Sequence, residues 1–205
     1  MYQPLTDLSK PQIPRNWLHF IPRHPLCKNG KSAYAQELAQ KMRKPGIPLY
    51  YLATMIPADR EDEERITRHR RDREGCGFMT VEVGRDILTA IDQCDRRGVF
   101  LLDSVTALLA NEMFTPGGYV ETDIHIKVAG DLEGLAKQID NIVIVSDFIC
   151  SDALIYDSLT EAYKQGLAYI DRQTAGFCEV VLETSCGTYF AFKGRDVFKE
   201  LLCDY

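Results

Sequence analysis

The residues with the clearest chemical use in this chain lie in the stretch Cys27–Ser32, which reads Cys-Lys-Asn-Gly-Lys-Ser. A Gly-Lys-Ser triplet between a strand and a helix is typical of a phosphate-binding loop, whose backbone N–H groups and helix N-terminus face an anion. We expect the loop backbone at Asn29 and Gly30 to bind phosphate. The Lys31 ammonium would reach the β- and γ-phosphates of a nucleotide, and the Ser32 hydroxyl would help to hold Mg²⁺.

Asp103 is a second candidate, because it directly follows the apolar run Val99 to Leu102. In P-loop enzymes, an acid at the end of such a strand faces Mg²⁺ or its bound water. The alternative is that Asp103 caps a helix starting at Ser104, a position for which aspartate is well suited. Because Lys31 and Ser32 lie upstream, the metal-side role is favoured. The sequence thus predicts Mg²⁺ held by Ser32 and Asp103.

His69 is a third candidate, within an unusual charged segment from Asp59 to Arg73. Acidic residues come first and arginines last, an order that complements a helix dipole and predicts a helix. Ile66 is its one sizeable apolar residue, so we expect the helix to pack sparingly or to lie at a subunit boundary. Arg65 and Arg73 flank His69 at i−4 and i+4, where their guanidinium groups could bind phosphate beside the imidazole. The alternative is an ordinary surface histidine.

Composition narrows the class of protein. A net charge of −6 over 205 residues argues against general nucleic-acid binding, because no excess of Lys and Arg is available to neutralise phosphates. No apolar run approaches the ~20 residues of a membrane span, and the N-terminus lacks the order of a signal peptide. Seven cysteines without a Cys-x-x-Cys pair indicate free thiols in a reducing cytoplasm. We therefore expect a cytoplasmic globular protein.

The elements that must position these residues alternate along the chain. We expect an irregular leader over residues 1–16 and a single P-loop nucleotide-binding domain over 17–205. Strands are predicted near 17–21, 49–53, 78–83, 99–103, 141–146, 179–184 and 188–192, and helices near 33–42, 59–73, 87–91, 105–113, 124–139 and 151–174. This alternation predicts an α/β fold with a mostly parallel sheet, helices on both faces and an antiparallel strand near the C-terminus. Ligands of such sheets bind at the carboxyl ends of the strands, where Gly30, Asp103 and Asp147 fall.

Five short motifs follow one another along the chain. They are Gly30-Lys31-Ser32; Tyr51-Leu52-Ala53-Thr54; Arg65-Ile66-Thr67-Arg68-His69-Arg70; Asp103-Ser104-Val105-Thr106 with Asn111; and Gly187 with Lys193-Gly194. In order and spacing they resemble the adenosylcobinamide kinase / adenosylcobinamide-phosphate guanylyltransferase family of cobalamin biosynthesis. The resemblance runs from about Leu18 to Gly194.

The resemblance implies a RecA-like P-loop domain, usually trimeric, with two activities. Such an enzyme phosphorylates adenosylcobinamide with ATP or GTP, and then transfers GMP from GTP to adenosylcobinamide phosphate through a histidine–GMP intermediate. Carried over to this chain, Lys31 and Ser32 hold phosphate and Mg²⁺, Asp103 is the metal-side acid, and His69 accepts the guanylyl group. The expected partners are therefore a corrinoid substrate, GTP or ATP, and further copies of the chain.

Departures from the family pattern keep alternatives open. Pro25 stands where the complete phosphate-loop pattern has glycine, and Phe148 stands where the family has glutamate. These changes favour a nucleotide-responsive binding protein that kept the fold and lost one or both activities. An unrelated small-molecule kinase on a P-loop fold is a further alternative, but it would leave the helix of Arg65 to Arg70 unexplained. The survival of Lys31 and His69 favours the enzyme.

Overall fold

The computed structural model describes residues 17–22, 31–115, 117, 119–147, 149, 154–185 and 188–203. The leader predicted over residues 1–16 lies outside the described residues. So do Asn29 and Gly30 of the predicted phosphate loop, the side chain of Lys31, and both departures from the family pattern, Pro25 and Phe148.

A seven-stranded sheet forms the centre of the molecule, in the spatial order β3-β2-β4-β5-β1-β6-β7. The strands are β1 (Trp17–Pro22), β2 (Leu49–Ala53), β3 (Phe78–Glu82), β4 (Val99–Asp103), β5 (Asn141–Val145), β6 (Val180–Ser185) and β7 (Thr188–Lys193). All neighbouring strands pair in parallel except β6 and β7, which are antiparallel. The predicted mostly parallel sheet with an antiparallel strand near the C-terminus is therefore confirmed.

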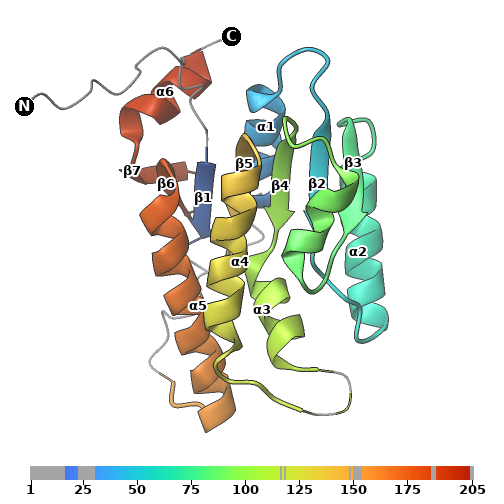
Figure 1. The fold of residues 1–205 in the computed structure, drawn as a ribbon, viewed down its shortest axis with the longest axis vertical. Coiled ribbons are helices and arrows are strands. Elements are labelled where there is room, and N and C mark those ends of the chain that lie inside the picture. The colour runs from blue at the N-terminus through green and yellow to red at the C-terminus, as the bar shows by residue number, and fades with distance from the viewer. Residues whose placement is uncertain are drawn as a thin grey trace, which may run out of the picture.

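Helices cover both faces of this sheet (Figure 1). They are α1 (Lys31–Met42), α2 (Arg60–Asp72), the 3₁₀ helix η1 (Ile87–Gln93), α3 (Val105–Met113), α4 (Ile124–Gln138), α5 (Ser158–Phe177) and α6 (Arg195–Cys203). Helices α1 and α6 contribute to the apolar cluster on one face, and η1, α3, α4 and α5 contribute to the cluster on the other. In Figure 1, α4 and α5 lie in front of the sheet and α1 lies behind it.

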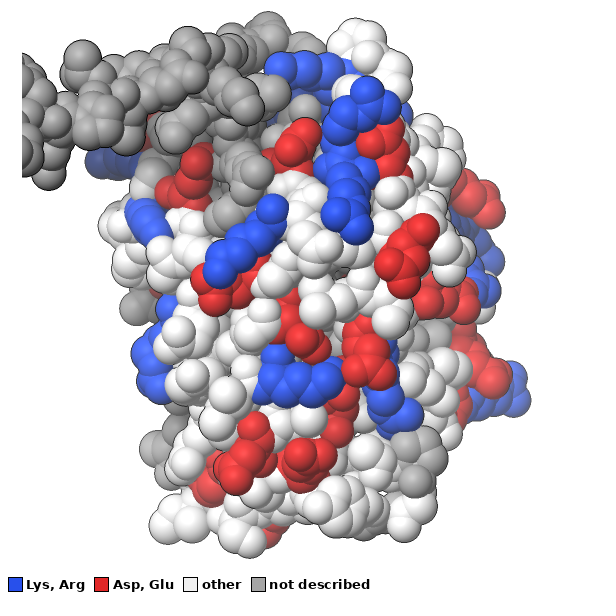
Figure 2. Space-filling view, in the orientation of Figure 1, with Lys and Arg blue, Asp and Glu red and all other residues white. Residues whose placement is uncertain are grey.

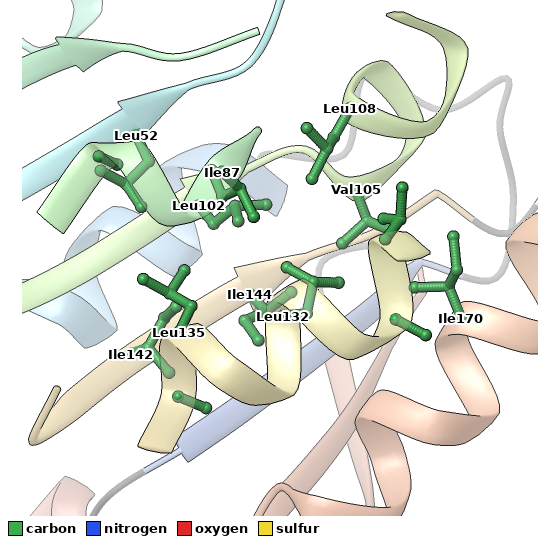
Figure 3. Packing of buried hydrophobic residues seen from close by; sticks show 14 of the residues in the cluster. Leu52, Ile87, Leu102, Val105, Leu108, Leu132, Leu135, Ile142, Ile144 and Ile170 are labelled. Carbon is green, nitrogen blue, oxygen red and sulfur yellow. The ribbon is translucent and has the colours of Figure 1, made fainter. Parts of the chain in front are cut away.

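The larger core cluster shows how alternating strand residues select a face. Leu52 and Leu102 lie on the face of the sheet that α4 covers, in one cluster with Leu132 and Leu135 of α4 (Figure 3). All four residues are almost fully buried. Their strand neighbours Tyr51 and Leu101 belong to the opposite cluster, beneath α1. Because successive strand residues point to opposite faces, Asp103, two residues after Leu101, also lies on the α1 side.

The register brings several strand ends to one level. Ala53 at the end of β2 pairs with Glu82 of β3 on one side and with Asp103 of β4 on the other. Asp103 in turn pairs with Val145 near the end of β5. In Figure 1 these ends form the lower edge of the sheet. Polar residues that follow separate strands are thereby gathered along one edge.

The charged helix α2 has a capped N-terminus and no buried residue. Its N-cap Asp59 accepts a hydrogen bond from the Asp62 backbone N–H at 2.9 Å, and acidic residues fill the first turn. None of its residues, all of which are described, is buried. The predicted helix and its sparse packing are therefore confirmed, and most of its polar surface faces outward.

The helix predicted near Ile87 is present and is of the 3₁₀ type. The long helix predicted from Ser151 begins at Ser158, because the Asp157 side chain accepts hydrogen bonds from two backbone N–H groups and caps the helix there. Helix α6 was not predicted at all; its Phe198 is buried against the cluster beneath α1. Within the described parts of the chain, every helix is too short or too polar to cross a bilayer.

Basic and acidic side chains are interspersed on the face that α4 and α5 cover (Figure 2). Lys127 of α4 forms ion pairs with three carboxylates, those of Asp86, Glu112 and Asp131, at 2.8 to 3.0 Å. Glu112 is 8% exposed and belongs to α3, so this cluster ties α3, α4 and the turn before η1 together. The charges on this face thus contribute to the packing of its helices.

Candidate functional site

A cavity of about 410 Å³ opens at the carboxyl ends of β2, β3 and β4. Side chains of α2 form one wall, and the start of α3 contributes Ser104 and Ala107. Its lining residues include Tyr51, Ile66, His69, Arg70, Arg73, Glu82 and Asp103. The structure therefore brings together three residues predicted for the site: His69, Arg73 and Asp103.

Asp103 is held by Tyr51, whose hydroxyl donates a 2.7 Å hydrogen bond to Oδ2 of Asp103. Tyr51 is buried, and its burial, together with the neighbouring Asp103 carboxylate, raises the pKa of the phenol. The phenol therefore remains a donor to the carboxylate at neutral pH. This hydrogen bond fixes the orientation of Asp103 at the cavity.

The alternative role of Asp103 as a helix cap is wrong. Ser104 is the N-cap of α3, and its hydroxyl accepts a hydrogen bond from the Ala107 N–H at 3.3 Å. Thr54 locks the same turn: the Ser104 N–H donates to Thr54 Oγ1 at 2.7 Å, and that hydroxyl donates to the Ser104 carbonyl at 2.8 Å. Because Ser104 caps the helix, the Asp103 side chain is available to the cavity.

Asn111 fastens the segment between β2 and α2. Its amide donates to the Thr54 carbonyl at 2.7 Å and to the Gly84 carbonyl at 2.9 Å. Ile56 lies so close to Gly84 that a Cβ atom there would meet its side chain at 2.4 Å. The ends of β2, β3 and α3 are thus joined in one rigid corner beside the cavity.

Arg73 lies over the ring of Tyr51, with its guanidinium carbon 3.6 Å from the ring centroid. It is 7% exposed, its Nε has no hydrogen-bond partner, and among the described residues it forms no ion pair. A buried guanidinium group without a counter-ion is costly. An anion in the cavity would supply the missing partner.

Arg65 behaves differently from Arg73, although both stand four residues from His69. Arg73 is the C-cap of α2, and its guanidinium group lies over the Tyr51 ring. Arg65 remains half exposed, 3.9 Å from Asp62, and lines a neighbouring cavity. The prediction that both arginines flank His69 at one phosphate is therefore supported by the shared cavity for Arg73 alone.

His69 is half buried and lines the cavity from α2. The next residue, Arg70, forms an ion pair with Glu82 of β3, which ties this part of α2 to the sheet. The interpretation of His69 as an ordinary surface residue agrees less well with this position, because most α2 residues are exposed whereas His69 is half buried beside the cavity. His69 is placed where a ligand in the cavity would meet it.

The structure describes only the C-terminal part of the predicted phosphate loop, from Lys31 onward. Helix α1 begins at Lys31, as the predicted strand–loop–helix arrangement requires, and Ser32 in its first turn is half buried. Ser32 and Asp103 both offer oxygen atoms, which Mg²⁺ prefers, and α1 covers the face on which Asp103 lies. No group of three potential metal ligands occurs among the described residues. Ser32 and Asp103 would have to hold Mg²⁺ together with water and substrate phosphates.

Sequence reasoning missed Tyr51 and Glu82 as parts of the site. The signal for Tyr51 is periodicity: a strand residue two positions before the end shares a face with the last residues of neighbouring strands. For Glu82, the signal is its position as the last residue of β3, because ligands bind at the carboxyl ends of parallel strands. Neither pattern separates a site residue from a core residue until the strand order is known.

The model of the family described as cobinamide kinase / cobinamide phosphate guanyltransferase matches residues 26–191 of this chain. The chain belongs to this family. The match covers the phosphate-loop triplet, the helix bearing His69 and the strand ending at Asp103, and it confirms the resemblance seen in the sequence.

The family assignment agrees with the observed fold. In the mostly parallel sheet of this chain, β5 lies between β1, the strand before the Gly-Lys-Ser triplet, and β4, which ends at Asp103. Among solved structures, the chain is similar to the flagellar accessory protein FlaH from Methanocaldococcus jannaschii, at 12% identity and a TM-score of 0.44, covering 87% of this chain and 78% of that one. No curated protein matches the sequence.

Proposed function

We propose that this protein transfers GMP from GTP to the phosphate of a cobinamide-type acceptor, with His69 as the covalent carrier. The family supports cobinamide kinase and guanyltransferase chemistry in cobalamin biosynthesis. The observation that carries the proposal for this chain is the shared cavity of His69, Arg73 and Asp103. It combines a nucleophile, a cation that lacks a counter-ion and an acid at the end of a strand.

The transfer consists of two displacements at one phosphorus atom. In the first, the lone pair of a neutral His69 nitrogen attacks the α-phosphorus of GTP, a P–N bond forms, and the bond to the β-phosphate oxygen breaks to release pyrophosphate. In the second, a phosphate oxygen of the acceptor attacks the same phosphorus and the P–N bond breaks. His69 is regenerated, and the acceptor leaves as a guanosine diphosphate ester.

The neighbours of His69 support this chemistry electrostatically. The Arg73 guanidinium group would bind phosphate oxygens that gain charge during each displacement, and its position on the Tyr51 ring holds it ready for them. Ser32 and Asp103 would hold Mg²⁺, which when bound supplies positive charge to the pyrophosphate group. Tyr51 would keep Asp103 in place for that role.

We further propose that the kinase reaction uses the Gly30-Lys31-Ser32 loop with ATP or GTP, and that the protein forms trimers. The unburied surface of α2 supports association of several copies, because a helix that buries nothing within its own subunit has a face available for another. The competing function, nucleotide-responsive binding without turnover, is favoured by Pro25, which lacks the N–H of a regular loop residue and fixes its own φ.

Intact-mass measurement after incubation with GTP and Mg²⁺ tests the carrier role. We expect a GMP-sized mass increase that is labile to acid and stable to base, as for a phosphoramidate. It should be absent from His69→Ala and retained in His125→Ala, the matched histidine control on α4. An increase that persists in His69→Ala would overturn the assignment. No increase in a parent protein that binds GTP would favour the binding protein.

A further inference from the structure

A second cavity, of about 530 Å³, adjoins the one that contains His69. The two share four lining residues, Met55, Pro57, Ser104 and Ala107, which form a common wall. Three of the elements around the second cavity are α2, α3 and α5, which contributes Tyr163. A ligand in the second cavity would therefore lie directly beside the proposed guanylyl carrier.

Helix α2 passes both cavities in succession. Arg65 lines the second and His69 lines the first. Four residues of α-helix correspond to about 6 Å along the axis. A phosphate group attached to a ligand in the second cavity could thus reach the imidazole by extending past the lining residues that the two cavities share. The Arg65 side chain is half exposed, and its 3.9 Å separation from Asp62 leaves its guanidinium group able to bind such a phosphate.

Apolar and polar residues line the second cavity in equal numbers, and four of the polar ones are charged: Asp62, Arg65, Arg85 and Asp147. Met55, Ile56, Ala110, Phe114 and Tyr163 supply the apolar surface. Ile56 is 45% exposed and Phe114 is 40% exposed, so both present apolar area to whatever occupies the mouth. Exposed apolar groups around a hollow mark a binding surface more often than an accident of packing.

A further exposed aromatic residue belongs to the loop that follows Phe114. Tyr119 is 68% exposed, and its carbonyl accepts a hydrogen bond from the Thr115 N–H at 3.1 Å. The polar groups of the lining include the Thr106 hydroxyl, the side-chain oxygen of Asn111 and the Asp147 carboxylate. A wide apolar rim with hydrogen-bonding groups below it suits a flat ring that carries amide arms.

We propose that the second cavity binds the corrinoid acceptor. The corrin ring would lie across the mouth on Ile56, Phe114 and Tyr119, its amide arms would reach the polar lining, and its phosphate would pass Arg65 toward His69. The assignment of the phosphate rests on the proposed guanylyl transfer, whereas the binding of the ring does not. The nucleotide would occupy the first cavity, so both substrates would meet at the shared wall.

Filling the second cavity tests the proposal. Ala110 lines the second cavity and not the first, and is half buried. Ala110→Trp should therefore exclude the ring and weaken cobinamide binding at least tenfold in equilibrium dialysis, followed by visible absorbance. Formation of the GTP-dependent mass adduct should be unchanged. Gly130→Trp is the matched control, because Gly130 is exposed on α4 and a Cβ atom there would meet nothing within 4 Å.

Two further variants separate the parts of the site. Phe114→Ala should weaken cobinamide binding severalfold, whereas Ile126→Ala, which removes a comparably exposed apolar side chain from α4, should not. Arg65→Gln should raise the KM for the phosphorylated acceptor and leave the affinity for unphosphorylated cobinamide unchanged. Circular dichroism of each variant establishes that it is folded.

The outcomes distinguish this inference from the guanylyl-transfer proposal. If the parent forms no adduct with GTP, the carrier role of His69 is wrong. Cobinamide dialysis still tests whether the second cavity binds the corrinoid. If folded Ala110→Trp and Phe114→Ala bind cobinamide as tightly as the parent, the cavity assignment is overturned. Loss of adduct formation in Ala110→Trp, with cobinamide binding retained, would also overturn it and assign the second cavity to the nucleotide.

Discussion

The hydroxyl of Tyr51 donates a 2.7 Å hydrogen bond to Oδ2 of Asp103. The two residues are diagonal neighbours on β2 and β4, because Tyr51 pairs with Leu101 and Ala53 pairs with Asp103. The ring of Tyr51 also carries the Arg73 guanidinium group, 3.6 Å from its centroid. One buried side chain thus positions the proposed metal-side acid and the proposed phosphate-binding cation.

Replacing Tyr51 by Phe should separate these two roles. The ring and its contact with Arg73 remain, but Asp103 loses its donor. A hydrogen bond to a charged group contributes about 1.5 kcal/mol or more, so urea unfolding should show a loss of that order. The Mg²⁺ concentration needed for half-maximal adduct formation should rise, while the affinity for GTP without metal should not change. Tyr169→Phe on α5 is the control, and an equal effect of both changes would contradict the role of Tyr51.

Replacing Arg73 by Met should make the free protein more stable and the nucleotide complex weaker. Met keeps much of the apolar contact with Tyr51 and removes a buried charge that has no ion pair among the described residues. We expect the free energy of unfolding to rise by about 1 kcal/mol and GTP binding in calorimetry to weaken at least tenfold. Arg68→Met, on the exposed surface of the same helix, should change neither. Unchanged GTP affinity in Arg73→Met would remove this residue from the site.

Replacing Lys127 by Met should destabilise the protein at neutral and mildly alkaline pH. Burial alone would lower the pKa of Lys127, but hydrogen bonds with Glu112, Asp86 and Asp131 outweigh it and raise that pKa. The stabilisation is therefore present below the ordinary lysine pKa of about 10.4 and is lost only at more alkaline pH.

In Lys127→Met, the buried Glu112 carboxylate loses its cation. Because Lys127 is partly exposed, solvent screening reduces the expected loss at pH 8 to about 2 kcal/mol. Urea denaturation at pH 8 measures the loss, with Lys137→Met at the exposed pair with Glu133 as the control. A loss no larger than that of the control would show that the ion pairs of Lys127 do not stabilise the fold.

Cys178 should make the folded state less stable at alkaline pH. Burial raises the pKa of its thiol to about 12, whereas a thiol in the unfolded chain titrates near 8.5. Above about pH 8.5 the unfolded chain releases this proton and the folded chain keeps it, so stability falls by up to about 1.4 kcal/mol per pH unit from this group.

Urea midpoints between pH 7.5 and 10 measure this dependence on pH. The slope should be shallower in Cys178→Ala and unchanged in Cys76→Ala, since Cys76 is only partly buried. The native protein should also react with iodoacetamide faster at Cys76 than at Cys178, as peptide mapping would show. Rapid labelling of Cys178 in the folded protein would contradict its burial.

Much of the framework could be predicted from local patterns. Continuous apolar runs specified β2 and β4, and the bounds of α2 followed from Asp59 and from the order of its charges. These features depend on residues near one another in the chain, so the sequence determined them by itself. The family motifs added the expectation that His69 and Asp103 belong to one site, which the shared cavity supports.

The tertiary structure decided which of these residues meet. Arg65 and Arg73 are equivalent in their spacing from His69, but Arg73 ends the helix and packs on Tyr51, whereas Arg65 lines the second cavity. Likewise, Asp103 could have capped α3, but Ser104 does so and leaves the acid to Tyr51. Both outcomes depend on strand order and register, which place residues about fifty positions apart side by side. A linear pattern does not contain that information, because contacts across a parallel sheet arise only once the connecting helices have packed.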